Sequence, residues 1–343
     1  MNRLTDLHPS TGGERVGRHL KQPWKFFHRA VLVLVVLLFH GAQGYPADKK
    51  KITFGFSAIS PTGTGLWMAK EIGAFDKYGI DASLVFISSG PVVVPALIGG
   101  DLQAALSGTS SVIAAVSGGA SLVSIASLVN RPYLRLWVQP EINRLEDLRG
   151  KTLGVSRFGA TTDNLTRILL RKTGLEGAVN VRQIGGTLEV GVAFQHRQIA
   201  GAVLASLRVD TPAKMLVDLA EMGIQYSMGT IVVSRDFHRR NPEILEAIMR
   251  AYLEGAAAIH YQKETALRAI ARHTRIRDPK TTAENYNDSI KYLDRVPRVE
   301  PEAVNSIAES IGKKTIPFET WVDNSIVDRL NREGFIEQLY RTR

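Results

Sequence analysis

Hydrophobic and polar positions follow two periods along the chain after residue 50. Short apolar runs typical of strands occupy 52–57, 82–87 and 103–106, and segments with helical periodicity lie between them at 65–75 and 91–98. The order is therefore strand, helix, strand, helix, strand. This alternation predicts an α/β unit in which helices cover a sheet.

A second unit of the same kind begins near residue 151. Its predicted strands lie at 151–156, 179–183 and 201–204, and its predicted helices lie at 161–172 and 188–196. The chain thus repeats one supersecondary pattern. We expect two α/β lobes.

Two of the strand runs, 84–87 and 122–129, are almost continuously apolar. Strands buried on both faces have this pattern, which predicts parallel sheets between layers of helices. An internal echo supports two related lobes: segment 96–106 aligns with segment 193–203, and apolar positions fall on apolar positions. Each segment is predicted to form a helix, a turn and a strand.

The pattern changes after residue 234, where helix follows helix to the end of the chain. The predicted helices of this tail lie at 242–261, 263–273, 279–294, 301–311 and 324–333. We therefore expect an α/β fold with a helical C-terminal tail.

The first 44 residues are predicted to be a signal peptide. A basic region of about 30 residues precedes an unbroken apolar run at 31–39, which is too short to cross a membrane as a helix. Ala42 and Gly44 provide the small residues of a cleavage site, so cleavage is expected after Gly44 and the mature chain would begin at Tyr45. The alternative is an uncleaved anchor. The mature protein is expected to be periplasmic in a Gram-negative cell.

Composition excludes several kinds of site. The 343 residues contain no cysteine, which rules out disulfides, thiolate metal sites and a lipoprotein acylation point. The formal net charge is +10, but residues 1–44 carry six Lys/Arg and two Asp/Glu, which leaves about +6 on the mature chain. A mildly basic globule of this size does not predict a nucleic-acid partner.

Small and hydroxylated residues fill four strand-to-helix junctions, at 60–65, 88–90, 107–111 and 156–162. Ligands of open α/β sheets bind beyond the carboxyl ends of the strands, where helix N-termini attract negative charge. Ser and Thr at such places also cap helices, so this alternative stays open. The predicted ligand-binding residues are Thr62, Gly63, Ser88, Ser89, Gly108, Thr109, Arg157, Gly159, Thr161, Thr162 and Gly186.

Arg157 is the one charged side chain in this set. It follows a predicted strand and precedes a predicted helix, where a guanidinium could hold an oxyanion or bridge the two lobes. An ordinary surface arginine fits the same position.

No catalytic or cofactor motif accompanies these residues. The pair Gly63 and Gly65 resembles a dinucleotide-binding turn, but Met68 occupies the third glycine position. The histidines of the mature chain lack the paired spacing of metal ligands. We therefore expect no cofactor, no metal and no catalytic residue.

Two segments carry a family resemblance. Residues 99–111 and 145–163 resemble the periplasmic substrate-binding proteins of ABC importers, in the nitrate, sulfonate and taurine branch (SsuA/THI5-like, NMT1). The resemblance extends over about residues 50–335. It implies a type II periplasmic-binding-protein fold, in which two lobes joined by two crossover segments close on a ligand.

The resemblance also implies where the lobes divide. Lobe 1 would comprise residues 45–138 and 230–343, and lobe 2 residues 139–229. The two crossovers would lie near 134–139 and 228–232.

By the same resemblance, the protein captures a small polar or anionic organic solute and delivers it to an ABC permease in the inner membrane. Sulfonate-, nitrate-, taurine- and pyrimidine-like ligands all remain open, and a monomer is expected. One rival is an enzyme related to thiamine pyrimidine-precursor synthases, but the cysteine-rich motif of those enzymes is absent. The other is a periplasmic sensing partner of a membrane receptor.

Overall fold

The structure is a computed structural model that describes residues 48–57, 59–207, 211–275, 278–313 and 316–341. The predicted signal peptide and its cleavage site lie outside the described residues. Among the described residues, no helix is both long enough and apolar enough to cross a membrane.

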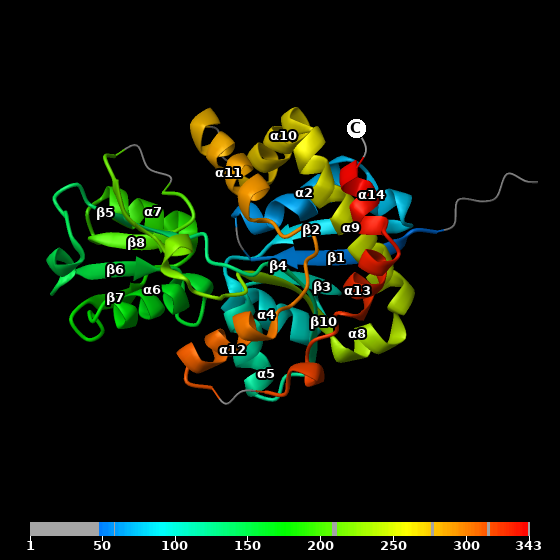
Figure 1. Cartoon of the computed structure of the whole chain (residues 1–343), viewed down its shortest axis with the longest axis horizontal. Coiled ribbons are helices and arrows are strands. Elements are labelled where there is room, and N and C mark those ends of the chain that lie inside the picture. The colour runs from blue at the N-terminus through cyan, green and yellow to red at the C-terminus, as the bar shows by residue number, and fades with distance from the viewer. Residues whose placement is uncertain (1–47, 58, 208–210, 276–277, 314–315, 342–343) are drawn as a thin grey trace, which may run out of the picture. The chain divides into compact units, whose positions relative to one another are not determined.

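Two five-stranded sheets organise the described chain, and helices cover both faces of each sheet (Figure 1). The strands of the first sheet are, in spatial order, β2 (Ile80–Phe86), β1 (Lys50–Phe56), β3 (Ala104–Ser107), β10 (Gly229–Ser234) and β4 (Leu122–Val129). Those of the second are β7 (Asn180–Gln183), β6 (Thr152–Val155), β8 (Gly201–Leu204), β5 (Arg135–Val138) and β9 (Lys214–Asp218). We call the parts built on these sheets lobe 1 and lobe 2.

The two sheets share one strand order, and the echo noted in the sequence falls on equivalent elements. Segment 96–106 covers the end of α4 (Gly90–Gly99) and most of β3. Segment 193–203 covers the end of α7 (Thr187–Gln195) and most of β8. In each sheet, the strand concerned is the third in spatial order. The predicted similarity of the two lobes is confirmed.

The prediction that the sheets are parallel is wrong for one strand in each. β10 is antiparallel to β3 and β4, and β5 is antiparallel to β8 and β9. Both strands begin next to the last residue of a neighbouring strand. Arg135 at the start of β5 pairs with Leu204 at the end of β8, and Thr230 near the start of β10 pairs with Ser107 at the end of β3. A strand that starts at the carboxyl edge of its parallel neighbours must run against them. This direction depends on how the chain connects the lobes, which the apolar pattern does not encode.

The predicted boundary at residue 138 lies at the end of β5. β5 pairs only with strands of the second sheet, so by strand pairing residues 135–138 belong to lobe 2, whereas the prediction assigned them to lobe 1. β10 pairs in the first sheet from Gly229 onward, next to the predicted boundary at 229/230. The full lobe boundaries remain a prediction.

The remaining helices include three that were not predicted, at 109–117, 235–240 and 335–341, and two separated by Gly73 in place of the one predicted at 65–75. In lobe 1 they are η1 (Pro61–Gly63), α2 (Thr64–Glu71), α3 (Ala74–Lys77) and α5 (Thr109–Ser117), and in lobe 2 η2 (Leu145–Leu148), α6 (Thr161–Lys172) and η3 (Leu219–Met222). The tail contains α8 (Arg235–Arg240), α9 (Pro242–Tyr261), α10 (Lys263–Thr274), α11 (Pro279–Tyr292), α12 (Pro301–Ser310), η4 (Phe318–Thr320), α13 (Ser325–Arg332) and α14 (Phe335–Arg341). Proline begins α9, α11 and α12, where its missing N–H has no helical partner to lose.

The two continuous apolar runs differ in burial. Every residue of β4 is buried, as predicted. β2 instead forms the edge of its sheet and alternates in exposure over its first half; Val85 and Phe86 are 39% and 41% exposed. The prediction of burial on both faces is therefore wrong for β2.

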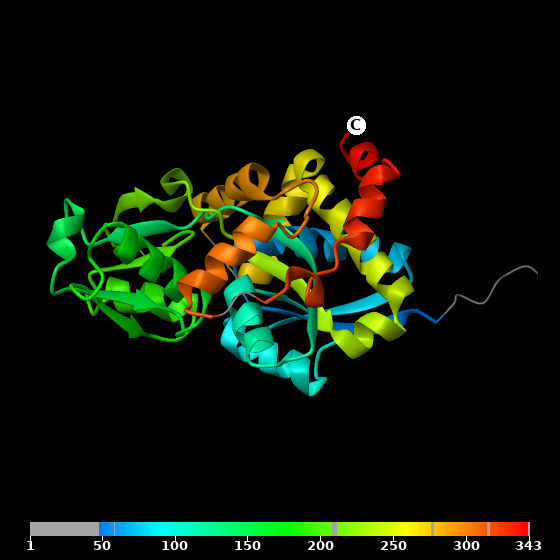
Figure 2. The same cartoon turned by 60° about the horizontal axis from the view of Figure 1, so that its bottom comes forward.

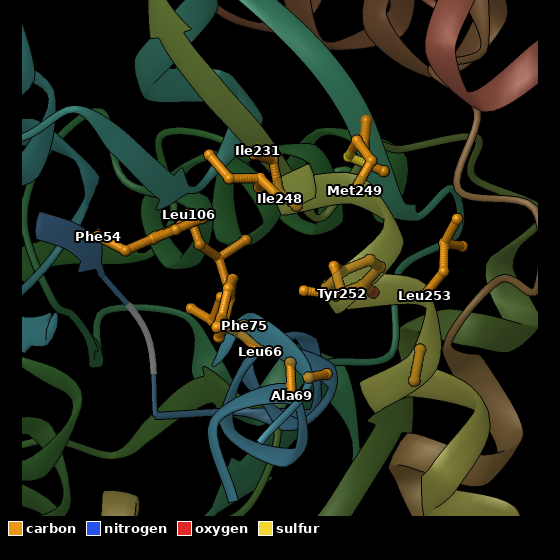
Figure 3. Close-up of a cluster of buried hydrophobic side chains, with 14 of the residues drawn as sticks. Phe54, Leu66, Ala69, Phe75, Leu106, Ile231, Ile248, Met249, Tyr252 and Leu253 are labelled. Carbon is orange, nitrogen blue, oxygen red and sulfur yellow. The ribbon is translucent and has the colours of Figure 1, made fainter. Parts of the chain in front are cut away.

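Close packing of α2 on α9 forms the centre of the lobe 1 core (Figure 3). Phe54, Leu66 and Tyr252 are fully buried there. Gly255 on α9 faces the backbone of α2, and a Cβ atom built on it would lie 2.8 Å from the Cα atom of Ala69. Glycine is thus required for this approach of two helix backbones.

Gly255→Ala is expected to lower the free energy of unfolding by about 1–3 kcal/mol, because the added methyl group meets backbone atoms that cannot rotate away. Gly99→Ala is the matched control. It also lies in a helix, but its nearest neighbour would be Asp101 Oδ2 at 3.9 Å. Urea unfolding of both variants measures the difference, and equal stabilities would show that α2 and α9 can separate at little cost.

Candidate ligand-binding site

A cavity of about 90 Å³ lies at the strand ends between the two lobes. This volume is several times the roughly 10–15 Å³ that one water molecule needs by the same measure. Ten of the described lining residues carry a hydroxyl group: Ser57, Ser60, Thr62, Ser107, Tyr133, Ser156, Thr161, Thr162, Thr187 and Ser206. The wall therefore offers many hydrogen-bond donors and acceptors in a confined space.

Four helices begin at this cavity, two from each lobe. Gly90 and Thr187 are the first residues of α4 and α7, Gly108 is the N-cap of α5, and Ala160 is the N-cap of α6; all four residues line the cavity. In these four described helices, no side chain caps the N-terminus. The alternative that Ser and Thr serve as caps is thus not observed here. Converging helix N-termini favour a negatively charged or oxygen-rich group.

Four of the predicted residues line the cavity: Thr62, Gly108, Thr161 and Thr162. Thr162 also shapes its own loop, since its Oγ1 accepts a hydrogen bond from the Ser156 N–H at 3.0 Å and lies 2.8 Å from the Ser156 hydroxyl. Thr161 comes from lobe 2, and a Cβ atom built on Gly108 of lobe 1 would meet its Oγ1. The cavity is therefore lined by residues of both lobes.

Three further predicted residues, Ser88, Gly159 and Gly186, lie at the seam where the lobes touch. The hydroxyls of Ser110 and Ser111 donate to the Gly159 carbonyl at 3.2 and 3.1 Å. A Cβ atom on Gly186 would lie 2.6 Å from Ser88 Oγ. The two hydrogen bonds to Gly159 join lobe 1 to lobe 2 beside the cavity, and Gly186 leaves room for Ser88.

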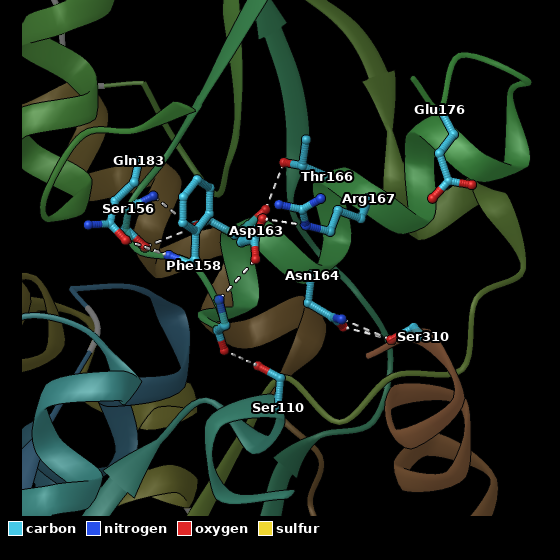
Figure 4. A network of polar contacts seen from close by, with 12 residues as sticks. Ser110, Ser156, Phe158, Asp163, Asn164, Thr166, Arg167, Glu176, Gln183 and Ser310 are labelled. Carbon is cyan, nitrogen blue, oxygen red and sulfur yellow. Dashed lines mark hydrogen bonds and ion pairs between the residues drawn. The ribbon is translucent and has the colours of Figure 1, made fainter. Parts of the chain in front are cut away.

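A network of hydrogen bonds and an ion pair surrounds the lobe 2 side of this seam (Figure 4). The Gly159 N–H donates to Asp163 at 2.9 Å, and Arg167 donates to the same carboxylate at 2.8 Å. The Asn164 amide donates to the hydroxyl of Ser310 in α12, also at 2.9 Å. A second view shows α12 beside α5 and α6 (Figure 2).

Gly63, Ser89, Thr109 and Arg157 are not brought to the cavity wall. Gly63 packs on the ring of Trp67. Ser89 is buried at φ 75°, a backbone region that favours glycine, and its hydroxyl has no hydrogen-bond partner among the described residues. The Nε of Arg157 is likewise buried without a partner in the described structure. That any of them touches a ligand stays a prediction.

Thr109 lies in the core of lobe 1. Its hydroxyl is 2.7 Å from that of Ser227, which is 2.7 Å from that of Ser127, and all three residues are fully buried. This chain of hydroxyls ties the N-terminus of α5 and strand β4 to the segment that leads into β10.

Thr109→Val is expected to lower the free energy of unfolding by about 1–3 kcal/mol, because Ser227 loses one buried hydrogen-bond partner. Thr109→Ser keeps the hydroxyl and is the matched control. Denaturant unfolding of both variants measures the difference. If the two variants lose equal stability, the methyl group rather than the hydroxyl of Thr109 matters.

Tyr133 and Ser206 are among the lining residues that were not predicted. Tyr133 precedes β5 in the first crossover; burial raises its pKa, so the neutral phenol donates to Ser60 Oγ at 3.1 Å. Ser206 follows β8, and the strand-end rule would have found it had that junction been included.

An ion pair links the lobes near the same wall. Arg135 at the start of β5 binds both carboxylate oxygens of Asp288 in α11, at 2.8 and 2.9 Å. It also donates to the carbonyl of Ala205, a lining residue, at 2.9 Å. Asp218 lies 3.6 Å away, and all three charged side chains are at most 16% exposed. The neighbouring carboxylates raise the pKa of Arg135, with Asp288 the main cause.

Solved structures share this fold. The periplasmic aliphatic sulphonate binding protein SsuA from Escherichia coli has a TM-score of 0.62 at 18% identity, over 84% of this chain and 94% of that one. The periplasmic nitrate-binding protein NrtA from Synechocystis PCC 6803 has a TM-score of 0.64 at 14% identity, over 85% and 88% of the two chains. The predicted fold, a two-lobed α/β periplasmic-binding-protein architecture with a helical tail, is confirmed.

Relatives found by sequence match only part of this chain. Curated proteins of Brucella abortus and Brucella suis, both named as binding proteins, are 33% identical over 136 residues. The match spans 39% of this chain and 41% of the relatives, so the chain matches less than half of their length. The sequence profile described as NMT1/THI5 like matches residues 60–266, more than half of the chain. By that match, the chain belongs to the NMT1/THI5-like family.

Proposed function

We propose that this protein captures a small polar or anionic organic solute between its lobes and delivers it to an ABC permease. One observation carries the proposal: a cavity lined by both lobes receives four helix N-termini without side-chain caps and ten hydroxyl side chains. Such a wall suits hydrogen bonding to a small oxygen-rich group. The names of the structural relatives, which include a sulphonate-binding and a nitrate-binding protein, support the same kind of ligand.

The mechanism is a shift between open and closed arrangements of the lobes. A solute that touches Thr62 of lobe 1 and Thr161 of lobe 2 together does so only when the lobes are closed. Its binding free energy therefore favours the closed form. The permease would recognise that form. On this proposal, the protein binds its solute and does not transform it.

The location belongs to the same proposal. Export requires a signal, and residues 1–44 have the pattern of a cleavable one. Expression of the full gene in a Gram-negative host tests this. A periplasmic product that begins at Tyr45 is expected, and retention of the full-length chain in the membrane fraction would favour the uncleaved anchor.

A thermal-shift screen of residues 45–343 tests the function. A ligand present at 100 times its Kd adds about 2.7 kcal/mol to the free energy of unfolding. We expect at least one sulfonate, carboxylate, nitrate, taurine or pyrimidine compound to raise the melting temperature, and the increase should grow with the logarithm of the ligand concentration. Recovery of that compound unchanged after long incubation separates binding from catalysis. If no compound of these classes stabilises the protein, the proposal fails.

A further inference from the structure

The cavity wall contains a second kind of surface besides hydroxyls and helix ends. Six large apolar side chains line it: Ile59, Leu106, Leu134, Leu188, Leu204 and Met228. Every polar side chain among the described lining residues is a hydroxyl. The described wall thus combines uncharged hydrogen-bonding groups with an apolar surface.

We infer that the cavity selects organic monoanions with an apolar body and rejects their amino analogues. This inference rests on the proposed function and names the ligand class of the same site. Helix N-termini and O–H groups stabilise one negative head group without a countercharge. The apolar side chains then gain from contact with a hydrocarbon body, at about 0.8 kcal/mol per buried methylene, or roughly fourfold in affinity.

An ammonium group on the ligand meets a different environment. Hydroxyls can accept from it, but no described lining residue offers a carboxylate to balance the charge. Glu189, in the first turn of α7, does not line the wall, and its Oε2 lies beside Gly186 at the seam. Burial of an unpaired charge costs several kcal/mol, which corresponds to well over 100-fold in affinity. A small inorganic anion such as nitrate avoids that cost but has no hydrocarbon body to contact the apolar side chains of the wall.

Leu188 is the position at which this selectivity can be reversed. It lies in the first turn of α7, lines the cavity and is 44% exposed, so it sits at the rim. An aspartate there is compatible with a helix N-terminus and would supply the missing countercharge. Val192, one turn further along α7, is 56% exposed and does not line the cavity. Val192→Asp adds the same charge to the same helix outside the wall.

Calorimetric titration of residues 45–343 tests the inference with matched probes. The first pair is 1-propanesulfonate and 3-amino-1-propanesulfonate, the second is butyrate and 4-aminobutyrate, and nitrate is the inorganic probe. Alkanesulfonates and alkanoates of three to six carbons provide the length series. We expect affinity to rise with chain length in at least one series, and the amino compound of that series to bind at least 100-fold more weakly.

In each pair, Leu188→Asp is expected to lower the ratio of the two affinities, plain compound to amino compound, at least tenfold. Val192→Asp is expected to leave that ratio unchanged. The inference is overturned if an amino compound binds within tenfold of its partner in the unsubstituted protein, or if nitrate equals the tightest organic probe. It is also overturned if Leu188→Asp and Val192→Asp act alike. If the amino compounds bind best, the proposed ligand class is wrong but the proposed capture of a solute is supported. If no probe of any class binds, both proposals are wrong.

Discussion

Arg135→Met is expected to lower the free energy of unfolding by about 3–5 kcal/mol. The guanidinium binds Asp288 through two hydrogen bonds and lies 3.6 Å from Asp218, and both carboxylates are at most 14% exposed. Methionine keeps the length of the apolar stem but leaves the buried carboxylate of Asp288 without its ion-pair partner and takes one nearby cation from Asp218. Removal of one partner from such a pair is costly even where the intact pair adds little. Urea unfolding at neutral pH measures the loss.

The same chain contains a suitable control for Arg135. Arg144 pairs with Asp147 at 3.2 Å, but its side chain is 75% exposed. Exposed pairs contribute about 0–1 kcal/mol, so Arg144→Met should lose no more than that. If both arginine variants lose the same small amount, the pair between β5 and α11 behaves like a surface pair and does not brace the lobes.

Gly186→Val is expected to weaken ligand binding by about 5- to 150-fold and to leave the unliganded protein folded. Gly186 is the N-cap of α7 with φ −88° and ψ 177°, a conformation that valine adopts readily. A Cβ atom there would lie 2.6 Å from Ser88 Oγ in the other lobe and 2.5 Å from Oε2 of Glu189, the end of a flexible side chain in the same helix that can turn aside. Overpacking of about 1–3 kcal/mol in the closed form alone reduces the binding-competent fraction, and apparent affinity falls with that fraction. Calorimetric titration with the tightest ligand of the screen measures the effect.

Two further variants test whether a loss of affinity in Gly186→Val comes from its effect on lobe closure. Gly99→Val places the same side chain at the end of α4, where a Cβ atom meets nothing nearer than 3.9 Å, and should bind normally. Ser88→Ala in the Gly186→Val background removes the obstructing hydroxyl and should restore part of the affinity. Unchanged affinity in Gly186→Val would mean that the lobes need not meet at Ser88 when ligand is bound.

The elements that local sequence defines were predicted well. The helix predicted at 242–261 has those ends in the structure, because proline marks its start and its apolar face recurs at helical spacing. β2 was predicted as a buried strand because Leu84 to Ile87 are all apolar, but its place at the sheet edge depends on partners far away in sequence. The antiparallel direction of β5 and β10 depends on the crossovers in the same way.

The site was predicted in part for the same reason. Thr62, Gly108, Thr161 and Thr162 could be predicted because the loops at the carboxyl edge of a parallel sheet gather in one place. A strand end does not tell which of its side chains face the cavity and which lie behind its wall. Thr109 follows Gly108 directly, yet its hydroxyl points to Ser227 in the core.

The absence of cysteine makes the central claim, closure over a ligand, directly measurable. Ile98→Cys in α4 and Val192→Cys in α7 place two exposed labelling sites on helices whose N-termini line the cavity from opposite lobes. Double electron–electron resonance between spin labels at these sites reports the distance between the lobes. Saturating ligand is expected to shorten and narrow the distance distribution, and Gly186→Val is expected to need a higher ligand concentration for the same change. A distribution that stays the same with ligand bound would contradict closure.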